Sequence, residues 1–222
     1  MTKKVKIISV IIVVLLVAVI TVISLVWGRN QDNQVLRRIK NDQKLVEIYN
    51  KIKDYQTKPQ EADILIAEGF NWKSLAELTK DQYFFKQALF VYDLGAQKFG
   101  EQNVLFYWNA GKVAESMGRF DLAENYYKEA LRIAPSYADG YQNLADLYQY
   151  KFKKDPAEIV KIYDDGLKAS TGNAALFLNK CSYLRQISWN KEALECYKIL
   201  VQQYPANQGY KKIVQELEAK VN

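Results

Sequence analysis

Hydrophobic residues follow three different patterns along the 222-residue chain. Between Ile7 and Trp27 they run almost unbroken, without a charged residue, glycine or proline. From residue 31 to residue 56 they recur every three or four positions, which indicates a single amphipathic helix. Beyond Pro59 the helical spacing continues to the C-terminus, and no stretch alternates as a strand does. The pattern predicts an all-α protein with an N-terminal transmembrane helix.

The run from Ile7 to Trp27 has the length of a membrane anchor. Its 21 residues would form a helix about 31 Å long, enough for a hydrocarbon core of about 30 Å. A cleaved signal peptide is the alternative, because Lys3, Lys4 and Lys6 precede the run. Signal peptides have apolar segments of about 7–15 residues that end at a small-residue cleavage site. This run is longer and ends at Trp27 and Gly28 without such a site, which favours an uncleaved anchor.

Orientation of the anchor depends on the charges beside it. Basic residues flank both ends, so their distribution does not decide the orientation. Export of the short N-terminal tail would move about four positive charges against the membrane potential, at ~2.3 kcal/mol per charge per 100 mV. We therefore expect the N-terminus in the cytoplasm and the helical domain outside, with a cytoplasmic domain as the alternative.

Residues 30–58 are predicted to form an amphipathic linker helix between the anchor, with its tail at residues 1–29, and a domain that starts at Pro59. The apolar stripe of this helix consists of Val35, Ile39, Leu45, Ile48, Ile52 and Tyr55. Three interpretations fit the stripe. The helix is a spacer that packs on the following domain, a coiled-coil stem that makes a homo-oligomer, or a segment that lies on anionic lipid.

A motif recurs after Pro59, in which a small or aliphatic residue precedes a tyrosine by four positions. The four tyrosines, spaced by 35, 36 and 34 residues, are Tyr92, Tyr127, Tyr163 and Tyr197. Each motif follows a second helical pattern, such as Tyr107-x2-Ala110-Gly111, which we align in the first unit with Trp72-x2-Leu75-Ala76. A period of this length predicts helix pairs that bury their apolar faces only by stacking on one another.

The repeat resembles the tetratricopeptide repeat family over roughly residues 60–207, and the stretch from Leu105 to Pro135 matches it best. The resemblance implies a solenoid of antiparallel helix pairs wound into a right-handed superhelix. Its four units are expected at about 69–103, 104–137, 138–173 and 174–207, with the first helix starting as early as residue 60 and a capping helix at 208–222.

First helices in this family line a concave groove that holds a partner peptide or helix. The groove positions that the resemblance implies are Lys73, Ser74, Glu77, Trp108, Asn109, Lys112, Gln142, Asn143, Asp146, Leu178, Asn179 and Ser182. The three asparagines occupy equivalent positions and would hydrogen-bond a ligand backbone, or else only solvate their helices. Trp108 would be either an exposed anchor for the ligand or buried against the next unit.

Composition excludes several other functions. The chain has no histidine and only two cysteines, so histidine-based catalysis and zinc sites are absent, and no catalytic or cofactor-binding motif occurs. The net charge is +6, but residues 59–222 carry only −1, which argues against nucleic acid as a partner. Cys181 and Cys196 are predicted to be reduced, since facing helices rarely approach closely enough for a disulfide.

These features predict a non-enzymatic, single-pass membrane protein that binds a protein or peptide partner without a cofactor. Its role would lie in assembly, folding or secretion at the cell envelope. The alternative is a homo-oligomeric structural scaffold at the membrane that has no separate peptide ligand.

Overall fold

The computed structural model describes residues 31–221 apart from Asn41. The predicted anchor, Ile7 to Trp27, lies outside the described residues. Within the described part, no helix combines the length and the hydropathy that a membrane span requires.

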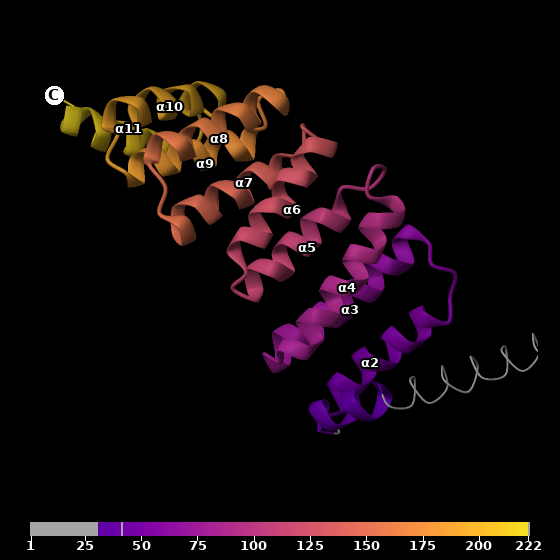
Figure 1. Ribbon diagram of the computed structural model, residues 1–222. Coiled ribbons are helices and arrows are strands. Elements are labelled where there is room, and N and C mark those ends of the chain that lie inside the picture. The colour runs from indigo at the N-terminus through magenta and orange to yellow at the C-terminus, as the bar shows by residue number, and fades with distance from the viewer. Residues whose placement is uncertain (1–30, 41, 222) are drawn as a thin grey trace, which may run out of the picture.

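The described chain folds into helices that stack in sequence order as an elongated array, which Figure 1 shows from indigo to yellow. Four helix pairs form the body of the array. They are α3 (Ala62–Thr79) with α4 (Gln82–Phe99), α5 (Leu105–Ser116) with α6 (Phe120–Ile133), α7 (Ala138–Leu147) with α8 (Pro156–Ala169), and α9 (Ala174–Gln186) with α10 (Asn190–Gln203). A π-helical turn, η1 (Tyr148–Phe152), extends α7, and α11 (Gln208–Val221) covers the last pair. Residues 31–221, with Asn41 left aside, contain no strand.

Local sequence explains where several helices begin and end. The side chains of Asp81, Asp155 and Asn173 accept a hydrogen bond from the first turns of α4, α8 and α9. Gly118 turns the chain between α5 and α6 with a φ of 74°, a left-handed value that costs glycine little.

The region before Pro59 contains two helices, so the expected single linker helix is wrong. Residues 31–39 form the first helix and α2 (Gln43–Gln56) forms the second. Lys40 takes a left-handed φ of 48°, which ends the first helix. The Asp42 side chain then accepts a hydrogen bond from the Leu45 N–H and starts α2. Polar residues between two apolar stripes therefore mark a turn rather than one face of a continuous helix.

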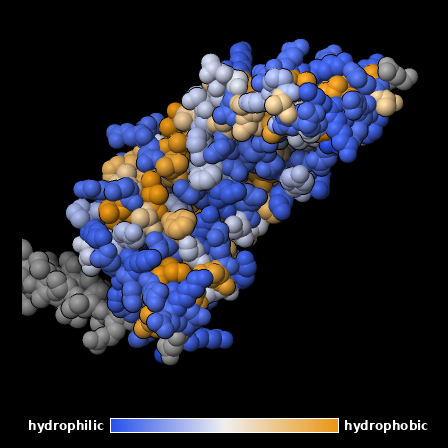
Figure 2. Space-filling view, turned by 180° about the vertical axis from the view of Figure 1, so that it is seen from behind, coloured by the Kyte–Doolittle hydropathy of each residue, from blue (hydrophilic) through white to orange (hydrophobic). Residues whose placement is uncertain are grey.

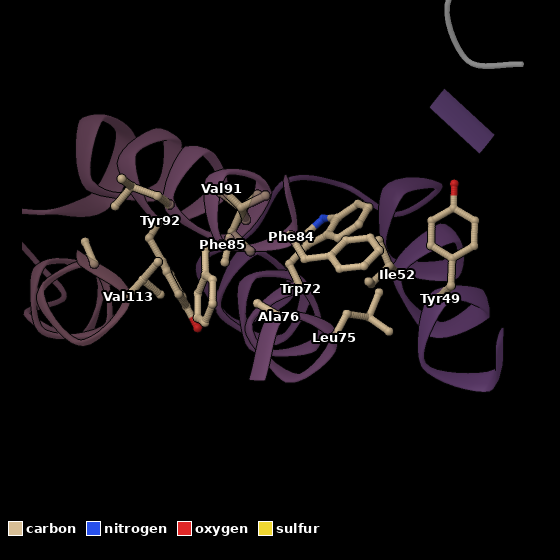
Figure 3. Close-up of a cluster of buried hydrophobic side chains, with 14 of the residues drawn as sticks. Tyr49, Ile52, Trp72, Leu75, Ala76, Phe84, Phe85, Val91, Tyr92 and Val113 are labelled. Atoms are coloured by element: carbon tan, nitrogen blue, oxygen red, sulfur yellow. The ribbon is translucent and has the colours of Figure 1, made fainter. Parts of the chain in front are cut away.

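These two helices belong to the hydrophobic core of the domain. Val35, Ile39 and Ile52 are almost completely buried against α3 and α4. Figure 3 shows Ile52 beside the rings of Trp72 and Phe84. Half of the linker stripe is therefore occupied inside the domain, and the rest of it, Leu45, Ile48 and Tyr55, is partly buried. This packing agrees with a helix pair that packs on the following domain.

The first unit has a different register from the one that the sequence alignment assigned. A Cβ on Gly69 would lie 2.6 Å from Cε1 of Tyr92, as one on Gly111 would lie 2.4 Å from Cε1 of Tyr127. Gly69 therefore takes the place that we had given to Ala76, seven residues further on. Two helical turns separate these positions, so both lie on nearly the same face and the apolar pattern alone does not distinguish them.

The reason for the shift is that the α3–α4 hairpin is longer than the others. Each of its helices has 18 residues, compared with 12 and 14 in α5 and α6. The 31–39 helix packs against the added turns. Arg38 forms an ion pair with Asp81 at 2.7 Å and lies 4.5 Å from the ring centre of Tyr83.

The last unit contains a disulfide between Cys181 of α9 and Cys196 of α10, so the expectation of two free thiols is wrong. The helices are joined by a turn at Ile187 to Trp189, and the two cysteines lie at nearly equal distances in sequence from its centre. They are therefore level with each other. Because both side chains are small, the helices come close enough to place the two Cα atoms 5.5 Å apart.

Candidate functional site

The candidate site is the surface formed by the first helices of the four pairs, α3, α5, α7 and α9, which we call the first-helix face. The first helices contact one another directly, α3 with α5 and α7 with α9. All of the predicted groove residues belong to these four helices. The face therefore brings residues from all four units into one row.

Hydrogen bonds between units connect several of the predicted residues. Lys112 Nζ donates to Asn143 Oδ1 at 3.4 Å, which connects α5 to α7. Asn179 Nδ2 donates to Gln142 Oε1 at 2.7 Å, which connects α9 to α7. Gln142 Nε2 also donates to Asp146 Oδ1 at 2.9 Å. The sequence indicated these residues as ligand contacts, and in the structure they bind one another.

The three asparagines at equivalent positions have different partners. Asn109 Nδ2 donates to the Leu105 carbonyl of its own helix at 2.8 Å, whereas Asn143 accepts from Lys112 and Asn179 donates to Gln142. A side-chain amide has one acceptor oxygen and two N–H donors. Each asparagine therefore keeps hydrogen-bonding capacity for a ligand after its internal bond is counted.

The carboxylates of Glu115 on α5 and Asp146 on α7 lie close enough to interact, in the middle of the first-helix face. Tyr127 donates its hydroxyl hydrogen to Glu115 Oε2 at 2.9 Å. Burial raises the pKa of Asp146, and the negative charge of Glu115 raises it further, while Gln142 and Lys112 act in the opposite direction. This part of the face therefore carries more negative than positive charge.

Trp108 packs against the residue that precedes α7 rather than standing free in a groove. Its ring meets Tyr137 edge-on with the ring centres 6.1 Å apart. The indole Nε1 is buried and has no hydrogen-bond acceptor among residues 31–221, Asn41 aside. A buried N–H without an acceptor is uncommon in proteins and marks a place where water or a ligand atom is expected.

The four repeat tyrosines, which we call the inward tyrosines, include a second buried polar atom without a hydrogen-bond partner in the described residues. Tyr127, Tyr163 and Tyr197 have hydroxyls that hydrogen-bond Glu115, Gln142 and Ser182 on the first helices. Burial raises the pKa of Tyr163 to about 12, although the hydrogen bond from Gln142 lowers it. The hydroxyl of Tyr92, the equivalent residue of the first unit, is buried and has no partner within the described part of the chain.

Predicted residues at the two ends of the face are bound mainly to their own helices. Lys73 and Glu77 form an ion pair at 3.4 Å, and Ser74 Oγ donates to the Phe70 carbonyl. Ser182 Oγ donates to the Leu178 carbonyl at 2.9 Å. Leu178 itself packs against the core around the disulfide.

Sequence reasoning missed Phe70, the residue that stands out on this face. Phe70 is 59% exposed and follows Gly69, as Lys112 follows Gly111 in the next unit. The misplaced register assigned this position to Glu77 instead. Sequence reasoning also missed Glu68, a buried carboxylate that accepts hydrogen bonds from Gln56 of α2 and Trp72.

The surface of the solenoid is polar over most of the view in Figure 2, and hydrophobic side chains appear there in small separate groups. Phe70 is one of seven large hydrophobic side chains that are exposed in the described part of the chain. Exposed aromatic side chains are frequent anchors where one protein binds another.

Comparison with known proteins agrees with this architecture. Residues 105–137 match the family model of the tetratricopeptide repeat. The described helices form an all-α solenoid of the type that tetratricopeptide repeats build. The family model describes a structural repeat. A comparison with curated protein sequences gives no match.

Solved structures show the same fold at low sequence identity. The crystal structure of MamA has a TM-score of 0.51 and 14% identity, and the match covers 78% of this chain and 87% of that one. YrrB, described as a TPR protein with an unusual peptide-binding site, has a TM-score of 0.52 and 16% identity, with 77% and 82% covered. A thermophilic TPR protein from Thermus thermophilus has a TM-score of 0.51 and 18% identity, with 68% and 86% covered. The likeness concerns the fold.

The described residues contain no cluster of side chains that could hold a metal ion. Residues 31–221, leaving out Asn41, contain no group of three or more cysteine, aspartate or glutamate side chains placed to hold a metal ion. The first-helix face instead offers amides, carboxylates and aromatic rings, which are groups that recognise a polypeptide.

Proposed function

We propose that this protein is a membrane-anchored interaction scaffold that binds a partner peptide or helix on its first-helix face. The observation that carries the proposal is Phe70, a largely exposed aromatic side chain in the row of predicted ligand contacts. A few side chains, often aromatic ones, contribute a large share of the binding energy in protein complexes. A partner side chain packed on Phe70 would cover apolar surface that water now contacts.

Two buried polar atoms support the same role. The Trp108 Nε1 donor and the Tyr92 hydroxyl have no partner in the described residues, although the other inward tyrosines have one. A ligand carbonyl reaching either group would supply the missing hydrogen bond, and an unmade buried hydrogen bond costs about 1–3 kcal/mol. YrrB, a structural neighbour, has a peptide-binding site in the same fold. Solenoids of this kind serve many partners, so the fold supports binding without naming the ligand.

The disulfide supports a domain outside the cytoplasm. Cys181 and Cys196 form a bond that persists in oxidising compartments and is rare where thiols are kept reduced. The proposed anchor, Ile7 to Trp27, with its basic N-terminal tail in the cytoplasm, would place the repeats on that side of the membrane. Role and topology together suggest assembly, folding or secretion at the cell envelope.

Photo-crosslinking in the native membrane tests the binding proposal. Full-length wild-type protein is compared with Phe70→Ala and with Ile199→Ala, whose isoleucine is also exposed but lies on α10. We expect Phe70→Ala to lose adducts that wild type and Ile199→Ala retain. Identical adducts in all three proteins would overturn the proposal. Accessibility of the C-terminus to external protease in intact cells separately tests the topology.

The homo-oligomeric scaffold makes a different prediction. An oligomer would give adducts only between copies of this chain, and these would persist after Phe70→Ala. Burial of Val35, Ile39 and Ile52 inside the domain argues against an oligomer built on the linker stripe.

A further inference from the structure

The helix of residues 31–39 runs antiparallel to α4. Gln31 Nε2 donates to Gln87 Oε1 at 3.5 Å, and Arg38, seven residues later, reaches Asp81, six residues earlier in the chain than Gln87. Moving back from Gln31 toward the N-terminus therefore means moving forward along α4. The next exposed side chain in that direction is Phe90.

Phe90 continues a stripe of α4 that the 31–39 helix covers only in part. Tyr83, Gln87 and Phe90 are spaced by four and three residues and so share one face of the helix. The first two contact Arg38 and Gln31. Phe90 is 66% exposed, the largest exposure among the big apolar side chains of the described residues.

This uncovered position is close to the end of the proposed anchor. Gln31 comes four positions after Trp27, so their Cα atoms are at most about 14 Å apart in any conformation. Phe90 lies only one helical turn past Gln87, a rise of about 4.5 Å. If Trp27 marks the edge of the hydrocarbon layer, Phe90 is held near the lipid headgroups.

Geometry also restricts how the domain sits on the membrane. From Gln87, α4 continues to Phe99, a further length of about 18 Å. If the 31–39 helix stood upright on the anchor, the end of this part of α4, with the charged side chain Lys98, would approach or enter the hydrocarbon layer. Burying such a charge in lipid is costly. A 31–39 helix that lies along the membrane surface avoids this cost, and we adopt that arrangement.

In that position the outer side of the 31–39 helix faces the lipid. Leu36, Arg37 and Lys40 are exposed and lie away from the buried residues Val35 and Ile39. Lys86 is also exposed, one turn before Phe90 on α4. The surface thus combines two large apolar side chains with three basic ones, a composition typical of segments that lie on membranes.

Charge on this surface favours anionic lipid. The nearby acids are engaged, Asp81 with Arg38, Asp32 with Lys53 and Asp93 with the hydroxyl of Tyr126. By contrast Arg37, Lys40 and Lys86 form no ion pair among residues 31–40 and 42–221. The excess is therefore positive, opposite to the charge of acidic headgroups.

We propose that Leu36, Arg37, Lys40, Lys86 and Phe90 form a lipid-contact surface that holds the repeat domain flat on an anionic bilayer. The proposal rests on the membrane anchor of the proposed function. It fixes which sides of the solenoid are available, because α4 faces lipid while the first-helix face remains open to a partner.

A fluorophore quenched by spin-labelled lipid tests the contact. Full-length protein with Phe90→Cys, or with Phe70→Cys as the matched control, is labelled with nitrobenzoxadiazole and reconstituted into phosphatidylglycerol-containing vesicles. Residues 70 and 90 are level in the α3–α4 hairpin, since Gly69 contacts Tyr92, but they lie on opposite helices. We expect quenching at position 90 and none at position 70. Leu36→Cys provides a second site, and the far-ultraviolet circular dichroism of each variant verifies its fold.

Several outcomes would overturn the proposal. Equal quenching at 90 and 70 would show that the domain has no fixed orientation. A probe at 90 that is shielded but not quenched would mean that protein covers Phe90, either a second copy or the upstream part of the same chain. Quenching at 90 that is unchanged by R37Q/K40Q/K86Q, or equally strong in phosphatidylcholine vesicles, would remove the role of the basic residues. Flotation of the protein with vesicles verifies the anchor separately, so loss of flotation and loss of quenching are distinguished.

Discussion

Ile52→Ala tests whether the helices before Pro59 are part of the fold or a spacer. Ile52 is fully buried and packs in the core cluster that contains Trp72 and Phe84. Truncation of a buried isoleucine to alanine costs about 2–5 kcal/mol, because the side chain loses its contacts and leaves a cavity. The same change in a solvated spacer helix would alter stability by less than about 0.5 kcal/mol. The two interpretations therefore differ by at least about fourfold in free energy.

Hydrogen exchange followed by mass spectrometry on the full-length protein is the suitable assay. Stacked repeats do not always unfold as one unit, so a global melting curve would blur a loss confined to one end. We expect faster exchange in α2, α3 and α4, by a factor of about 30 for a loss of about 2 kcal/mol. Peptides from α9 and α10 should be unchanged. Lys51→Ala, at the exposed neighbouring position, serves as the control. If Ile52→Ala and Lys51→Ala exchange alike, the assignment of these helices to the core is refuted.

Three further predictions follow from the rest of the structure. Thiol counting on denatured, unreduced protein should find no free cysteine. Replacement of Cys181 and Cys196 by serine should lower the free energy of unfolding by about 3 kcal/mol, the value for a disulfide loop of this length. Two labelled thiols would contradict the disulfide. Gly69→Val should destabilise by about 1–3 kcal/mol in urea unfolding, because its Cβ would lie 2.6 Å from a Tyr92 ring carbon, and a neutral result would restore the original register. Because the pKa of Asp146 is raised, the folded state holds this proton more tightly than the unfolded state does. The free energy of unfolding should therefore fall as pH rises above 3.8, the ordinary pKa of an aspartate. Asp146→Asn should flatten this pH dependence in unfolding curves recorded at several pH values above 3.8.

Sequence alone was sufficient for the helical class and for the repeat. Stacked helix pairs need a tyrosine and small residues at fixed intervals, because each pair buries its apolar face on the next. Tyr127, Ala123 and Gly111 are the members of this pattern in the second unit, and in the structure the Tyr127 ring packs on Gly111. Local signals such as the Asp81 and Asp155 caps also depend only on neighbouring residues. The apolar run from Ile7 to Trp27 is likewise a property of the sequence, and the anchor it predicts stays a prediction.

The tertiary structure decided the features that depend on distances between helices. A shift of two turns in α3 leaves the apolar pattern almost unchanged, so only the contact between Gly69 and Tyr92 reveals the register that exposes Phe70. Whether Cys181 and Cys196 meet depends on the length of the turn between their helices, since the turn sets which residues are level. The linker stripe looked the same whether it faced a second chain, lipid or its own domain. Periodicity shows that a face is apolar, but only packing shows what covers it.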